Sequence, residues 1–231
     1  NVATDLSLLA LARLLPLESA GRVFVVAVQT LTLSGCVFLH RAATRRRDPW
    51  PIVSALFLHN WILLFGFLNF QLGVALMLWA VGAWLLVRER SVPTRLAVGT
   101  TAALVLFFCH MLAFGFYAIV VAAIELGAAF ERRHAPATAL THLGVGALPF
   151  VPGLVLFARS STFAAGSSGG VEFQPHRWWK PFALARHFMS GNLYVDALTA
   201  AGGLVLVGVL VSGAKVSLTR RLAPAVAALV L

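Results

Sequence analysis

The stretch of residues 51–87 contains no aspartate, glutamate, lysine or arginine, and this constrains the fold more than any other feature. As one α-helix it would be roughly 55 Å long, whereas the hydrocarbon core of a bilayer is about 30 Å thick. Basic clusters flank both ends, and such clusters are retained in the cytoplasm. We therefore expect two spans, about 51–68 and 71–87, joined outside the cytoplasm by a turn at 68–71 that contains Asn69.

The composition excludes a soluble globular domain. Hydrophobic residues make up 60% of the 231 residues and charged residues 11%, and the mean hydropathy is +0.88. A soluble domain usually carries about 25% charged residues, because its surface must be hydrated. We therefore expect an all-α fold, in the form of a polytopic integral membrane protein.

The net charge of +10 would suit a nucleic-acid-binding protein, but the distribution of the charge does not. The basic residues fall in short clusters between apolar runs: "HRAATRRR", "RERSVPTR", "ERRH" and "KVSLTRR". Clusters in these positions are typical of cytoplasmic loops. The sequence therefore predicts membrane lipids as partners and no nucleic acid.

The other apolar runs can be divided into spans by the same two criteria, their length and the charges that flank them. Residues 96–130 fit two spans that turn near 109–115, which places His110 near the extracytoplasmic end; one tilted span with an interfacial helix is the alternative. Further spans are expected at 22–40, at 139–158 with kinks at Pro149 and Pro152, at 193–214, and from 223 onward. We thus expect about seven complete transmembrane helices and a truncated eighth, in a single domain, 1–231, cut from a longer chain.

Two segments are expected to lie outside the cytoplasm without crossing the membrane. In residues 1–21, Thr4 is placed to cap a short apolar helix, Asp5 suits its first turn, and Pro16 ends it. This helix is too short to span a bilayer, so we expect it to lie in the interface. The second segment is a polar loop at 159–192, in which "HRWWK" places two tryptophans beside cations. Anchoring at the interface is the ordinary explanation, and contact with a sugar or phosphate is the alternative.

A few polar groups fall within the predicted spans. His59 and Asn60 lie near the middle of a span, where we expect hydrogen bonds between helices, with a ligand cavity as the alternative. Glu125 lies close enough to the cytoplasmic end to reach the interface or to pair with Arg132.

The order of these elements resembles a known layout. An interfacial helix "NVATDLSLLALARLLPLESAGRVF", an inward span, "RRRDPWP", "HNWILLFGFLNFQLGVALMLWAVGAWL" and "FFCHMLAFGFYAIVVAAIEL" follow one another. This order is similar to that of bacterial polytopic membrane proteins with GT-C glycosyltransferase-like topology. The resemblance covers residues 1 to about 130 well and the rest loosely. It implies a location in the bacterial cytoplasmic (inner) membrane.

The resemblance also implies an activity. GT-C enzymes transfer a sugar from a polyprenyl-phosphate donor at the extracytoplasmic face, and their acidic catalytic residue lies in the first extracytoplasmic loop. That loop would lie before or at Asn1 here, so the acidic catalytic motif is expected upstream of Asn1. Asp5 is the one acidic residue in the neighbourhood, although its place at a helix start suits capping.

A transferase of this kind needs cations to hold the departing phosphate. The substrate-binding candidates predicted on the extracytoplasmic face are Arg177, Lys180 and Arg186 for phosphate, Trp178 and Trp179 for a prenyl chain or sugar, and Asn69 and His110 for polar contacts. Interfacial cations also contact lipid headgroups, and Asn69 and His110 also suit turn and packing roles.

We expect no cofactor, with a divalent cation left open. Cys36 and Cys109 both lie in apolar runs and show no metal-binding spacing, so they are predicted to be buried small residues. The alternative functions are a membrane transporter and a non-catalytic structural membrane subunit.

Overall fold

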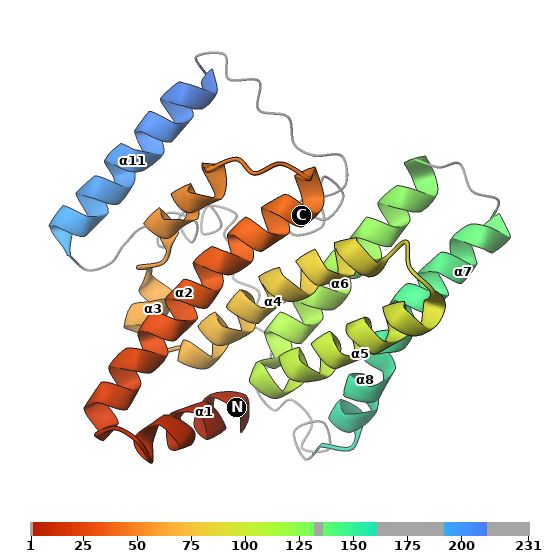
Figure 1. Ribbon diagram of the computed structural model, residues 1–231, viewed down its shortest axis with the longest axis horizontal. Helices are drawn as coiled ribbons and strands as arrows, with labels where there is room; N and C mark the ends of the chain where they lie inside the picture. The colour runs from red at the N-terminus through yellow and green to blue at the C-terminus, as the bar shows by residue number, and fades with distance from the viewer. Residues whose placement is uncertain (1, 132–135, 161–191, 212–231) are drawn as a thin grey trace, which may run out of the picture.

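A computed structural model describes residues 2–131, 136–160 and 192–211. These residues are helical and contain no β-strand, as predicted for an all-α fold (Figure 1). The helices are α1 Val2–Ala12, α2 Leu17–Thr44, η1 Trp50–Phe57 (a 3-10 helix), α3 Trp61–Leu64, α4 Leu68–Val87, α5 Val92–Cys109, α6 Met111–Glu131, α7 Pro136–Ala147, η2 Leu148–Phe150 (3-10), α8 Val151–Ala158 and α11 Leu193–Val211.

Five helical segments in the described part are long and apolar enough to cross a membrane. They are Leu17–Thr44, Leu68–Val87, Val92–Cys109, Met111–Phe130 and Leu140–Ala158. This is the arrangement of a multi-pass membrane protein. The expected total of seven complete spans is not reached in these residues, and the span predicted from residue 223 lies outside them.

Helices α2 and α4 pack side by side and run in the same direction. The Trp79 indole donates a hydrogen bond to the Leu31 carbonyl, 3.1 Å away. Four residues further along α2, Gly35 faces Leu78 and Trp79, and beyond it Phe38 faces Gly82. Contacts that advance together along both helices define a parallel pair. The chain between them must therefore return from one end of the pair to the other.

The returning chain is not the regular helix expected over 51–68, and that prediction is wrong. The segment 45–67 contains the 3-10 helix η1, a break at residues 58–60 and the four-residue helix α3. Pro49 and Pro51 bracket the start of η1, and proline disfavours a regular α-helix there. The turn lies at Phe65–Phe67, with Gly66 at a φ of +73°, and not at 68–71 as predicted.

Asn60 organises this break. Its Nδ2 donates to the Phe57 carbonyl at 2.9 Å, and its Oδ1 accepts from the Leu63 amide at 3.1 Å. The same Oδ1 accepts a hydrogen bond from Gln71 Nε2 on α4, at 2.9 Å. Asn60 therefore bonds to a neighbouring helix as expected, but it does so from a break in the chain and not from the middle of a helix, and His59 is exposed.

The predicted hairpin over 96–130 is confirmed, and the single tilted span is wrong. Helices α5 and α6 meet at His110, inside the predicted turn. The core between α4, α5 and α6 contains fully buried Trp84, Leu106, Tyr117 and Ile124. The short η2 turn at Leu148–Phe150 breaks the last span near Pro149, close to the expected kink.

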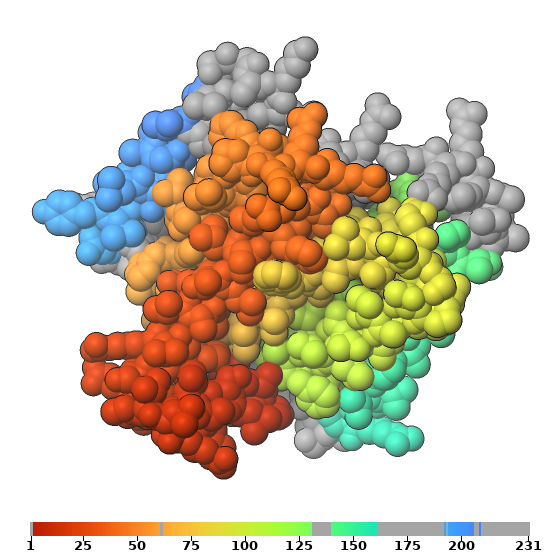
Figure 2. Space-filling view, viewed as in Figure 1, coloured from red at the N-terminus to blue at the C-terminus, as the bar shows by residue number. Residues whose placement is uncertain are grey.

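The two ends of the described chain lie at the periphery. Helix α1 lies across the end of the bundle, packed against α2, α4 and α5 (Figure 1). Residues 13–16 separate it from α2, which begins at Leu17, just after Pro16 and earlier than expected. Helix α11 follows the prediction of a helix from 193, and it lies at the edge of the molecule (Figure 2). It packs beside η1, where Gly202 faces Leu56.

Candidate functional site

Most of the predicted substrate-binding residues lie outside the described residues. These are Arg177, Trp178, Trp179, Lys180 and Arg186, all in the predicted loop 159–192. Their role in binding phosphate or a lipid chain stays a prediction.

The predicted catalytic motif also falls outside the described residues. It was expected upstream of Asn1, and Asn1 itself precedes the first described residue, Val2. An acidic catalytic residue before Asn1 therefore stays a prediction, and Asp5 is the nearest acidic side chain that the structure places.

The structure brings two other candidates, Asn69 and His110, to one end of the bundle. Asn69 is half-buried in the first turn of α4. The ring of the next residue, Phe70, meets the His110 imidazole edge-on, with 5.3 Å between ring centroids. His110 also lies against Gly73, whose lack of a side chain lets α4 approach α6 closely.

His110 serves as the start of α6. Its Nδ1 accepts a hydrogen bond from the Leu112 amide at 3.2 Å, and its carbonyl accepts one from the Phe114 amide. Burial lowers the pKa of His110, which favours the neutral imidazole. With Nδ1 as acceptor, the neutral ring carries its proton on Nε2 and presents it as a donor.

Asp5, the weak catalytic candidate, lies in the first turn of α1 and is exposed. A carboxylate in this position interacts favourably with the positive end of the helix dipole. Because α1 packs against the α4–α5 end, Asp5, Asn69 and His110 belong to the same end of the molecule. We call this the uncharged end after its hairpin tips, 65–67 and 109–110, which carry no charged residue; charges near it lie in α1, just after it and at the start of α2.

At the opposite end, a carboxylate lies inside the bundle. Glu125 is 3% exposed, about 9 Å from the end of α6. Its Oε1 accepts a hydrogen bond from the Trp84 indole at 3.0 Å and lies 3.3 Å from Arg88 Nε. Its Oε2 lies 3.7 Å from an Nη of Arg95. We call Trp84, Arg88, Arg95 and Glu125 the Glu125 cluster.

The Glu125 cluster joins three consecutive helices. Arg88 caps the C-terminal end of α4, Arg95 lies in the first turn of α5, and Glu125 lies in α6. The Arg95 guanidinium also stacks over the Trp84 ring, 5.5 Å from its centroid. Two buried guanidinium groups and one carboxylate leave one excess positive charge, and the buried Nε and one Nη of Arg95 have no hydrogen-bond partner among the described residues.

The sequence predicted Arg88 and Arg95 in a cytoplasmic loop. It predicted that Glu125 reaches the interface or pairs with Arg132, which lies outside the described residues. A signal was present in α5. Arg95 recurs at helical spacing with Gly99, Ala103 and Leu106, all on the buried face of that helix. An arginine in register with small buried residues indicates a buried cation that needs a carboxylate nearby.

The chemistry of the Glu125 cluster is that of a structural lock. Oε1 accepts the indole hydrogen bond and lies against Arg88, whereas Oε2 lies 3.7 Å from Arg95 without a hydrogen bond to it, so the carboxylate serves here to compensate buried positive charge. No group of three or more His, Cys, Asp or Glu residues that could hold a metal ion occurs in the described part of the chain. Comparisons with protein families, with curated proteins and with solved structures gave no match.

Proposed function

We propose that this multi-pass membrane protein is a GT-C-like glycosyltransferase that uses a sugar linked to polyprenyl phosphate. The proposed site lies at the uncharged end, between α1 and the loop 159–192. One observation carries the proposal: α1 is a short apolar helix packed across the ends of α2, α4 and α5. At 11 residues it spans about 17 Å, too short to cross a bilayer.

The outer face of α1 suits a lipid-linked substrate. Leu6 and Leu9 are 59% and 54% exposed, as expected for a helix that rests in the membrane interface. A polyprenyl chain would enter the site from the same layer, along this apolar face. Three of the polar residues at that end, Asp5, Asn69 and His110, are the candidates for contact with the headgroup of such a lipid.

In this proposal His110 is a hydrogen-bond donor. Its Nδ1 is occupied by the Leu112 amide, so Nε2–H is the group available to a phosphate or sugar oxygen. The cations for the phosphate come from Arg177, Lys180 and Arg186, and Trp178 and Trp179 support the prenyl chain or a sugar face.

Binding of the donor lipid to the full-length protein tests this function. We expect R177Q/K180Q to weaken binding of a labelled polyprenyl-phosphate sugar in nanodiscs at least tenfold. The matched control R46Q/R47Q removes the same charge at the opposite end and should leave binding unchanged. Equal binding by wild type and R177Q/K180Q would refute the proposed site, and absence of any donor binding by wild type would refute the function.

A transporter is the second candidate, and the returning segment 45–67 favours it. Interrupted helices at membrane depth line the substrate paths of many transporters, and η1 and α3 form such an interrupted crossing. Solute flux through sealed proteoliposomes, without turnover of the donor lipid, would select this function over the transferase.

A further inference from the structure

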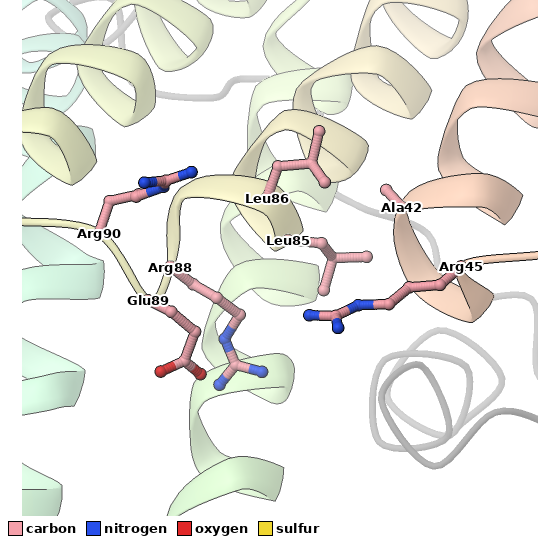
Figure 3. Close-up of a pocket in the computed structure, with 7 residues that line it drawn as sticks. All are labelled: Ala42, Arg45, Leu85, Leu86, Arg88, Glu89 and Arg90. Carbon is pink, nitrogen blue, oxygen red and sulfur yellow. The ribbon is translucent and has the colours of Figure 1, made fainter.

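A cavity of about 350 Å³ lies where the C-terminal ends of α2 and α4 meet, away from the uncharged end (Figure 3). Its polar lining consists of Arg45, Arg88, Glu89 and Arg90, and its apolar wall includes Leu85 and Leu86. We call this the arginine cavity. Its volume is near the lower bound for ligand sites, which suits one small headgroup.

The arginine cavity has a net positive charge. Three guanidinium groups and one carboxylate line it, which leaves two excess positive charges. The C-terminal ends of α2 and α4 each contribute about half a negative charge. The helix dipoles therefore offset about half of the excess, and the cavity still attracts an anion.

Two of the guanidinium groups converge from different helices. In Figure 3, the Arg45 side chain extends from the end of α2 across the cavity toward Arg88, at the end of α4. Like charges that face one another are unfavourable unless an anion lies between them. Arg88 is held from behind, because its Nε faces Oε1 of the buried Glu125. Arg88 also lines the cavity, so its guanidinium lies between the buried carboxylate and the cavity.

The backbone at Arg45 is unusual. Arg45 has a φ of 59° and is the one non-glycine residue with a positive φ in the described part of the chain. It follows the last turn of α2, and its amide donates to the Arg41 carbonyl at 2.9 Å. Glycine is the residue that normally takes this position, and other residues are strained there. The guanidinium is thus placed over the cavity despite an unfavourable backbone conformation.

The surroundings of the arginine cavity point to a lipid. Leu86 is 54% exposed beside it, and the ends of two membrane-spanning helices place it at the depth of the headgroups. We propose that the arginine cavity binds the phosphate of an anionic phospholipid, with the acyl chains along the apolar wall. This site is independent of the proposed glycosyltransferase site at the opposite end.

Lipid binding to the purified full chain tests the proposal. The probe is phosphatidylglycerol, titrated into detergent micelles that contain the protein, and phosphatidylcholine is the zwitterionic reference. Native mass spectrometry counts the lipid molecules bound to each protein. Loss of one hydrogen bond to the bound phosphate corresponds to about fivefold in affinity. We therefore expect R45Q/R90Q to weaken phosphatidylglycerol binding about 25-fold, while R46Q/R47Q, which removes equal charge outside the cavity, changes it little.

A second variant separates binding from folding. R45G removes the guanidinium and installs the residue that fits a positive φ. It should weaken phosphatidylglycerol binding about fivefold and melt no lower than wild type.

Equal losses in R45Q/R90Q and R46Q/R47Q would overturn the site, because the lipid would then respond only to surface charge. Undiminished binding by R45G would overturn it as well. Inorganic phosphate at millimolar concentration should not displace phosphatidylglycerol from the protein. If inorganic phosphate displaced phosphatidylglycerol as effectively as unlabelled lipid does, the ligand would be a soluble phosphate and not a phospholipid.

Discussion

The two ends of the α4–α5–α6 bundle hold their polar groups in different ways. At one end, Glu125 is buried among Arg88, Arg95 and the Trp84 indole. At the uncharged end, His110 meets the edge of Phe70 and caps α6, and α4 approaches α6 at Gly73. One end depends on charge compensation, and the other on close packing and helix capping.

This contrast changes the interpretation of the basic clusters. A topology argument treats every arginine between spans as a retention signal in water. Arg88 and Arg95 are instead 11% and 5% exposed at their side chains and paired with a carboxylate, whereas Arg45 and Arg90 are exposed. A single cluster in the sequence therefore contains cations that stabilise the bundle and cations that are available to a ligand.

The largest effect is expected from removing the charge of Glu125. E125Q leaves two buried guanidinium groups without a carboxylate, and breaking a buried ion pair costs about 3–5 kcal/mol. Reversible unfolding in mixed detergent micelles would measure the loss. The matched control is E18Q, because the Glu18–Arg22 pair is 79% and 78% exposed, and an exposed pair contributes less than about 1 kcal/mol. Equal losses of unfolding free energy in both variants would show that the Glu125 carboxylate does not stabilise the bundle as a buried ion pair.

The next effect tests the hydrogen bond to the carboxylate. W84F keeps an aromatic ring and removes the N–H group that reaches Glu125, and a hydrogen bond to a charged group contributes about 1.5–3 kcal/mol. W79F is the control, since the Trp79 indole donates to a neutral carbonyl, for which about 0.5–1.5 kcal/mol is expected. The same unfolding assay applies, and a loss in W79F as large as in W84F would contradict the ranking.

Packing at the uncharged end is tested by G73A. A Cβ at residue 73 would lie 2.8 Å from Ala113 Cβ and 3.2 Å from His110 Cβ, so α4 and α6 must separate. Overpacking of this kind costs about 1–3 kcal/mol. In G115A the new methyl meets nothing within 4 Å, and the better helix propensity of alanine should raise stability slightly. If G73A had the same free energy of unfolding as wild type, close packing of α4 on α6 would not explain the stability of this end.

The smallest effect concerns pH. Burial lowers the folded-state pKa of His110 below 6.5, so the unfolded chain binds more protons between the two values. Stability from this group is present above pH 6.5 and is lost as the pH falls below it. Melting temperatures from pH 7.5 to 5.5 should decline more steeply for wild type than for H110Q. Parallel profiles would show that His110 titrates as it does in the unfolded chain.

Length and charge arithmetic predicted much of the fold. It identified α2, the α5–α6 hairpin with His110 at the turn, and the break near Pro149. It also required the chain to cross between 51 and 68, and the parallel α2–α4 pair agrees with such a return. It did not reveal the form of that crossing, because hydropathy registers how apolar a segment is and not whether its backbone is regular.

The Glu125 cluster shows the other limit of the sequence. Arg88, Arg95 and Glu125 belong to three helices, and their contact depends on how those helices rotate against one another. Hydropathy gives no such rotation. The small residues Gly99 and Ala103 in register with Arg95 provide the only local indication, and they do not identify the partner.

Labelling of single cysteines tests the central claim, that the interrupted segment 45–67 carries the chain from one side of the membrane to the other. The single-cysteine variants R46C and F65C are made in a C36A/C109A background. Each is exposed to an impermeant maleimide, once in intact cells and once in inverted vesicles. Both positions are exposed. We predict labelling of R46C in inverted vesicles only and of F65C in intact cells only. Labelling of both from the same side would contradict the account.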